Sequence, residues 1–159
     1  MMSTFFPGAA RHPNSNRFAA IVGCADARVP VELIFSEGPN DLFVFRVAGN
    51  GMGDDVTASL SYAVDHLKDS LRTIGILGRS GCGAVSAAVD VYLEPAKYMQ
   101  IMTQKDPRQI LDSILIVIQL GATWLERVYG SEVVRRRGYR TTLIEVAIAL
   151  NAALTRALG

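Results

Sequence analysis

Short apolar runs alternate along this chain with longer segments of helical periodicity. Three runs are typical of strands: residues 18–23 (FAAIVG), 41–47 (DLFVFRV) and 73–77 (TIGIL). Strands that alternate with helices predict an α/β fold, with a mostly parallel β-sheet flanked by helices. Because parallel sheets are covered on both faces, we expect the strands at 18–23 and 73–77 to be buried on both faces.

Apolar residues at helical spacing predict the helices. A short helix is expected at 31–35, and longer ones around 56–67, 82–93, 110–125 and 143–154. Asp54 and Asp55 stand where they can cap the first of the long helices. Residues 1–17 are expected to form an N-terminal arm, and residues 18–159 a single domain.

The composition narrows the classes of function. The 159 residues are 50% hydrophobic and 19% charged, with net charge +1 and mean hydropathy +0.24. This balance argues against disorder and predicts a homo-oligomer that hides part of the apolar surface. The low net charge predicts no nucleic-acid partner, and the longest strongly apolar run, 114–118, is too short for a membrane span. The first residues lack the pattern of a signal peptide, so we expect a cytoplasmic protein with reduced cysteines.

Both cysteines directly follow predicted strands. Cys24 begins the segment CADAR, and Cys82 lies in the segment GRSGCG at a predicted helix start, where backbone N–H groups favour thiolate. In parallel sheets the functional residues lie beyond the carboxyl ends of the strands, so we expect the two thiols to lie close together. Zinc prefers thiolates but needs at least three protein donors; Asp26 is a candidate third, with Arg28 placed to hold it. The alternative is that each cysteine is an ordinary buried small residue.

These segments resemble the β-class carbonic anhydrases. CADARVPVELIF is similar to the family's Cys-x-Asp-x-Arg segment, and NDLFVFRVAGN is similar to its following strand and turn. SLSYAVDHL and then ILGRSGCGAVSAAV resemble its next helix and its His-x-x-Cys-Gly segment, and the order and spacing agree from about residue 18 to residue 91. The resemblance implies a parallel-sheet core, a homodimer or higher homo-oligomer, and reversible hydration of CO2 to bicarbonate.

The resemblance also implies roles for individual residues. Cys24 and Cys82 are expected to bind zinc, which lowers the pKa of bound water to about 7 and so supplies hydroxide. Asp26 and Arg28 are expected to form a dyad in which Asp26 either orients the hydroxide or ligates the metal in a closed form. The backbone of Gly81 and Gly83 is expected to line the substrate pocket.

One position departs from the family pattern. The zinc-binding histidine of the family falls on Arg79, and a guanidinium stays protonated and offers no lone pair. His66 is expected at a helix surface and His12 in the N-terminal arm, so neither is an obvious substitute. We therefore predict sharply weakened zinc affinity. The donors that remain are Cys24, Cys82 and Asp26.

Two further departures concern the sheet edge and Arg46. Members of the family usually continue past the last helix into a further edge strand, and the chain ends at residue 159, so we expect an uncovered edge strand. Some members bind regulatory bicarbonate with an arginine at the position of Arg46 and a tryptophan at the position of Ile21. We therefore expect that regulatory site to be absent and Arg46 to be a structural or interface salt-bridge residue.

Three functions stay open at this point. The first is CO2 hydration with zinc held by Cys24, Cys82 and Asp26. The second is a non-catalytic, metal-free relative that binds an anion or a partner protein, to which Arg79 points. The third is a thiol-based role for Cys82, which no Cys-x-x-Cys motif or resolving base in the sequence supports.

Overall fold

A computed structural model describes residues 18–38, 40–101 and 105–157. Three parallel strands, β1 (Ala19–Cys24), β2 (Leu42–Val47) and β3 (Thr73–Leu77), form one sheet in the order β2-β1-β3. Each strand lies within one residue of its predicted bounds, and the predicted α/β fold with a parallel sheet is confirmed. The N-terminal arm predicted at residues 1–17 lies outside the described residues.

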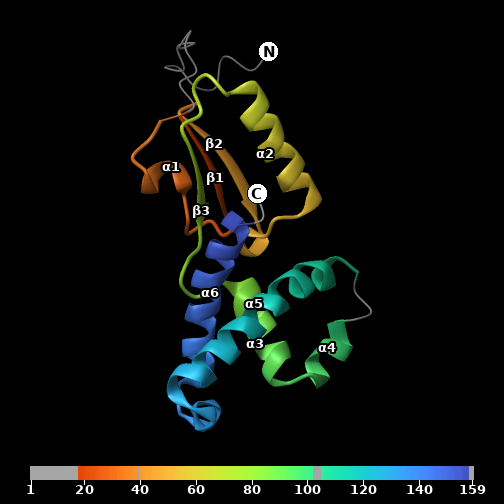
Figure 1. Cartoon of the computed structure of the whole chain (residues 1–159). Helices are drawn as coiled ribbons and strands as arrows, with labels where there is room; N and C mark the ends of the chain where they lie inside the picture. Colours follow the sequence, from red (N-terminus) through yellow and green to blue (C-terminus); the bar gives the residue numbers. More distant parts are fainter. Residues whose placement is uncertain (1–17, 39, 102–104, 158–159) are drawn as a thin grey trace.

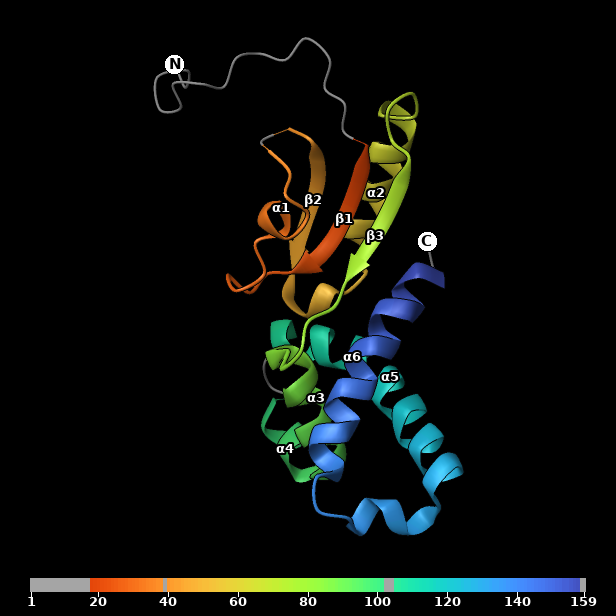
Figure 2. The same ribbon diagram turned by 90° about the vertical axis from the view of Figure 1, so that its left-hand side faces the viewer.

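The helices divide into two groups. Helices α1 (Val31–Ile34) and α2 (Asp54–His66) lie on opposite sides of the sheet, as Figure 1 shows. The others gather beyond the carboxyl ends of the strands (Figures 1 and 2): α3 (Gly83–Leu93), α4 (Ala96–Ile101), α5 (Lys105–Tyr129) and α6 (Tyr139–Ala157). Two 3₁₀ turns, η1 (Ala48–Asn50) and η2 (Ser131–Arg135), complete the chain. Helix α4 and turn η2 were not predicted from the sequence.

The central strand and the edge strand differ in burial. Every residue of β1 is buried, because β2 and β3 flank it. In β3, Thr73 and Ile74 are exposed, so the prediction that this strand is buried on both faces is wrong. Among the described strands β3 pairs with β1 alone, and its outer edge borders a hollow of about 520 Å³ lined by Ile74, Ile76 and Ala153, among others.

Most of the core lies in the helical layer. Its fully buried side chains include Ile114 and Ile118 on α5 and Leu143 on α6. Cys24 and Cys82 belong to this cluster, although Cys24 ends the central strand. The two cysteines therefore lie where the sheet meets the helices.

Helix α6 fixes the loops at this boundary. Gly78, directly after β3, lies so close to α6 that an added Cβ would be 3.2 Å from Ile148. The buried Asn151 donates a 2.8 Å hydrogen bond to the carbonyl of Gly49 in η1. None of the helices in the described part of the chain is long and apolar enough to span a bilayer.

Candidate active site

Arg46 shapes the loop that follows β1. From β2, its Nε donates to the carbonyl oxygen of Cys24 at 3.4 Å, and its Nη2 donates to that of Asp26 at 2.5 Å. The loop turns at the same place, because the N–H of Val29 donates to the Asp26 carbonyl at 3.1 Å. Arg46 thus has the structural role that we predicted, but it binds backbone carbonyls and forms no ion pair within the described residues.

The carboxylate of Asp26 accepts four hydrogen bonds. Oδ1 accepts from the backbone N–H of Arg28 at 3.0 Å and from its Nε at 2.9 Å. Oδ2 accepts from Nη2 of Arg28 at 2.8 Å and from Nη2 of Arg79 at 2.5 Å. These contacts, those from Arg28 first, hold the pKa of Asp26 well below its usual range. Since a carboxylate offers about four lone-pair positions, the donors on Asp26 use all of them.

Arg79 lies between the two predicted metal-binding loops. Its Nη1 donates to the carbonyl oxygens of Ser80 at 3.0 Å and Gly81 at 2.8 Å, while Nη2 reaches across to Asp26. The side chain is 12% exposed. Its buried Nε has no hydrogen-bond partner among the described residues. The guanidinium therefore ties the loop before α3 to the loop after β1.

The two cysteines influence each other's pKa, and their pKa values shift in opposite directions. Burial raises the pKa of Cys24, but the backbone N–H groups of Asp26 and Gly49 and the side chains of Arg79 and Cys82 outweigh it, so the pKa is lowered. Burial also raises the pKa of Cys82, and the neighbouring Cys24 adds to this against the N–H groups of the first turn of α3. Cys82 is the N-cap of α3. The N–H groups of the helix start favour the thiolate, as predicted, but burial and Cys24 dominate, so the pKa of Cys82 is raised.

The residues present do not fit a zinc ion. Structural and catalytic zinc sites use three or four protein donors. No group of three or more His, Cys, Asp or Glu side chains able to hold a metal occurs within residues 18–38, 40–101 and 105–157. Hydrogen bonds from Arg28 and Arg79 occupy all the acceptor positions of the Asp26 carboxylate. The guanidinium of Arg79 stands at the position where the family pattern has its zinc-binding histidine. The donor set is therefore two thiols beside a fixed positive charge.

The remaining predicted residues take varied positions. His66 is exposed on the last turn of α2, as predicted; its Nδ1 lies 3.0 Å from the Tyr62 carbonyl. His12 lies outside the described residues. Gly83 begins α3, and Gly81 adopts φ +61° and donates its N–H to Oε1 of Glu145 at 3.2 Å. Sequence reasoning missed Glu145, and no motif marks it, because its contact depends on how α6 packs.

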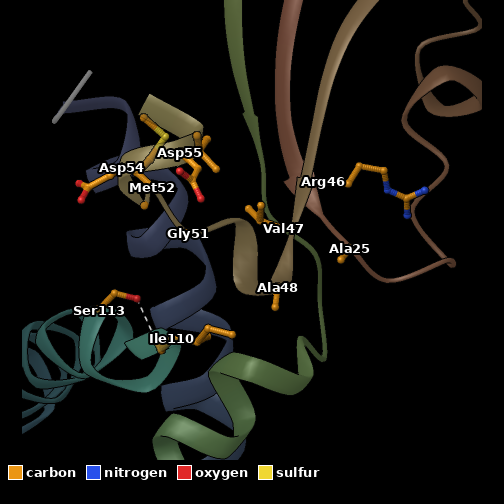
Figure 3. A pocket seen from close by; sticks show the side chains of 12 residues that line it. Ala25, Arg46, Val47, Ala48, Gly51, Met52, Asp54, Asp55, Ile110 and Ser113 are labelled. Atoms are coloured by element: carbon orange, nitrogen blue, oxygen red, sulfur yellow. Dashed lines mark hydrogen bonds between the residues drawn. The ribbon is translucent and has the colours of Figure 1, made fainter. Parts of the chain in front are cut away.

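A cavity of about 710 Å³ opens beside this centre (Figure 3). Ala25 and Arg46 lie on one side of it, and Asp54 and Asp55, from the start of α2, lie on the other. Ser113 of α5 also contributes to the wall. Ala25 is the one residue of the CADAR segment in the lining, so the two cysteines, Asp26 and Arg79 do not line this cavity.

Comparison with known proteins agrees with the geometry of the core. The family model described as carbonic anhydrase matches residues 19–111, which is more than half of the chain. The chain belongs to the β-carbonic anhydrase family. The matched segment contains all three strands and both cysteine loops. The similarity therefore covers the part of the protein that carries the candidate site.

Relatives of this family member match over different lengths. Carbonic anhydrase 2 of Mycobacterium tuberculosis is 48% identical over 71 residues, which is 45% of this chain and 33% of that protein. A carbonic anhydrase of Mycolicibacterium smegmatis is 32% identical over 137 residues, covering 82% of this chain and 64% of that protein. The chain thus spans a third to two thirds of the length of these relatives.

Solved structures support the fold. The β-carbonic anhydrase of Coccomyxa has a TM-score of 0.60 at 23% identity, with 88% of this chain and 60% of that chain covered. The β-carbonic anhydrase CcaA has a TM-score of 0.58 at 24% identity, with 88% and 57% covered. At these identities the likeness concerns the fold alone.

Proposed function

We propose that this chain is a metal-free member of the carbonic anhydrase family that does not hydrate CO2 and binds a small oxyanion, such as bicarbonate, at the Asp26 loop. The observation that carries the proposal is the engagement of Asp26. Both of its oxygens accept hydrogen bonds from Arg28 and Arg79, so neither oxygen is left to bind a metal or to orient a hydroxide.

The charge of Arg79 supports the absence of metal in a second way. Its guanidinium donates a hydrogen bond to Asp26 and helps to lower the pKa of Cys24. A divalent cation placed between the same thiols and carboxylate would be close to this fixed positive charge, which would oppose it. Arg79 cannot remove the repulsion by losing its proton, because arginine stays protonated in proteins.

The surplus of positive charge around Asp26 supports the binding of an anion. Three guanidinium groups, those of Arg28, Arg46 and Arg79, contact the loop that carries the single carboxylate of Asp26. The side chain of Arg28 is 74% exposed, so it can reach a ligand from solvent. Guanidinium groups bind planar oxyanions such as bicarbonate. Because Nε and Nη2 of Arg28 already bind Asp26, the anion would compete with that carboxylate for these donors or bind to Nη1.

Stopped-flow CO2 hydration with zinc quantification on the same sample tests the proposal. We expect no rate above buffer and far less than one zinc per chain when the protein is purified without chelators. One tightly held zinc per chain, or a rate proportional to zinc, would overturn it. Bicarbonate binding is measured by calorimetry against chloride; Arg28→Gln should weaken it, and no heat with the unaltered chain would reject the anion ligand.

Arg79→His is the matched variant for the metal. It restores the residue type that the family has at this position while the two thiols stay in place. We expect this variant to bind zinc more tightly than the unaltered chain. Equal, weak zinc binding by both proteins would contradict the view that Arg79 is what excludes the metal.

A second candidate function is CO2 hydration with zinc held by Cys24, Cys82 and Asp26. The position of both free thiols in one buried cluster favours it, since two thiolates are a recurrent part of zinc sites. It requires Asp26 to release both arginines. The zinc-proportional rate named above would select this candidate.

We also propose a homodimer or higher homo-oligomer in the cytoplasm. Exposed apolar side chains support self-association: Leu33 and Ile34 on α1 are 76% and 50% exposed, and Ile116 and Trp124 on α5 are 64% and 48% exposed. Light scattering coupled to gel filtration measures the mass. A strictly monomeric protein at tens of micromolar would contradict the proposal. The cytoplasmic location remains a prediction from the sequence.

A further inference from the structure

We propose that Cys24 and Cys82 form a reversible intramolecular disulfide when the protein meets a peroxide. The inference rests on the proposed metal-free centre, because bound zinc would hold both sulfurs as ligands. It assigns a redox role to two residues that the family pattern reserves for metal.

The fold places the two cysteines in one buried cluster. Both are free, both are buried where the sheet meets the helices, and each influences the pKa of the other. The same guanidinium holds both loops, since Arg79 binds Asp26, two residues after Cys24, and the carbonyl of Gly81, directly before Cys82. The partners that a disulfide requires are therefore brought together by the fold itself.

The surroundings favour Cys24 and Cys82 as disulfide partners of each other. Cys24 ends the central strand of the sheet, and Cys82 caps α3, so neither is in a loop that can swing far. The chain contains two cysteines in all, so any other disulfide needs a second molecule. The two residues are 5% and 2% exposed, which disfavours contact with a thiol of another protein.

Hydrogen peroxide is the oxidant in this reaction and accepts the two electrons that the thiols lose. One sulfur attacks a peroxide oxygen, the O–O bond breaks, and a sulfenic acid and water form. The second sulfur then attacks the first, the S–S bond forms, the S–O bond breaks, and a second water leaves with the remaining proton. Two thiols are oxidised and one hydrogen peroxide is reduced to two waters. A small dithiol reverses the step by thiol–disulfide exchange.

The test uses the full chain, reduced, desalted and checked for zinc. After treatment with equimolar hydrogen peroxide, we expect the denatured protein to show no free thiol and a mass lower by two hydrogen atoms. Peptide mapping should give one cross-linked pair containing Cys24 and Cys82, and dithiothreitol should restore both thiols. The thermal midpoint of the oxidised protein should rise, because the cross-link closes the loop between residues 24 and 82.

Cys24→Ser and Cys82→Ser are the matched controls, and each should gain oxygen or remain unchanged without any cross-link. Oxygen addition to the unaltered chain, a disulfide between two chains, or two unreacted thiols would each overturn the inference. Zinc separates this result from the proposed function. If one equivalent of zinc protects the thiols of the unaltered chain, the metal-free centre is wrong. If metal-free protein forms no disulfide, the redox inference alone is wrong. We expect zinc to protect Arg79→His and not the unaltered chain.

Discussion

Arg79 and Asp26 stand 53 positions apart in the sequence and meet through a 2.5 Å hydrogen bond between Nη2 and Oδ2. Asp26 follows the central strand and Arg79 follows the edge strand, so their contact bridges two neighbouring strand ends. The bridge joins the two loops that the family pattern joins through a metal. In this chain a side-chain cation makes that connection.

A double-mutant cycle measures the bridge. Arg79→Gln and Asp26→Asn should each lower the thermal midpoint, and the double variant should lose less than the sum because the two residues share one interaction. Arg28→Gln is the control: its side chain is 74% exposed, against 12% for Arg79, so we expect a smaller loss. Additive losses for Arg79 and Asp26 would show that the contact does not stabilise the fold.

A second prediction concerns Gly49 in η1, which has φ +67°. An added Cβ there would lie 3.0 Å from Ile114 and 3.1 Å from Ala84. Gly49→Ala should therefore destabilise the protein by about 1–2 kcal/mol for the left-handed backbone alone, with crowding in addition. Gly83→Ala is the control, since nothing lies within 4 Å of its added Cβ and it stands in a helix. Urea unfolding should show this control to be neutral or slightly stabilised; equal losses in both would refute the strain at Gly49.

Two isoleucines on α5 offer a matched test of the helical core. The side chain of Ile118 is fully buried, whereas that of Ile116 is 64% exposed. Ile118→Ala should cost about 2–5 kcal/mol through lost contacts and the cavity left behind. Ile116→Ala should stay within about 0.5 kcal/mol in the free chain. A large loss at Ile116 that depends on protein concentration would instead place this position in a subunit interface.

The pH dependence of stability should report the ion pair between Asp90 on α3 and Arg140 on α6. Nε and Nη2 of Arg140 donate to the two carboxylate oxygens at 2.6 and 3.0 Å, and these bonds lower the pKa of Asp90. A depressed folded pKa means that the pair stabilises fully above the unfolded value, about 3.9, and less as the pH falls through the folded value.

Arg140→Gln tests this pair. With its side chains 51% and 33% exposed, the pair should contribute about 0.2–1 kcal/mol at neutral pH and less in high salt. The difference in unfolding free energy between the two proteins should be constant from pH 7 to pH 5 and should narrow below about pH 4. A difference that widens on acidification would contradict the assignment.

The strands and long helices could be predicted because each repeats a simple pattern. Runs such as AAIVGC have few alternatives, and α5 carries apolar residues at helical spacing over many turns. Helix α4, with the sequence AKYMQI, has no such repeat, and its six residues are fixed by contacts with α3 and α5. The burial of β3 was predicted wrongly, because an apolar run does not reveal whether a strand is central or at an edge.

The site was predictable in its members but not in its contacts. The sequence named Cys24, Asp26 and Arg79, and the structure places their loops side by side. Cys24 and Cys82 are distant in sequence, so no short motif could mark them as neighbours. The role of Glu145 depends on the packing of α6 and had no local signal.

The sheet register has a consequence for how this centre tolerates change. Gly23 pairs with Arg46 and Leu77, and Cys24 pairs with Val47, so the loops begin at matched levels on adjacent strands. Side chains alternate between the two faces of a strand, so inserting or deleting one residue within β1 would reverse which face each later side chain occupies. We therefore expect single-residue insertions and deletions within β1 to disturb the arrangement of this centre more than substitutions in the loops at the strand ends.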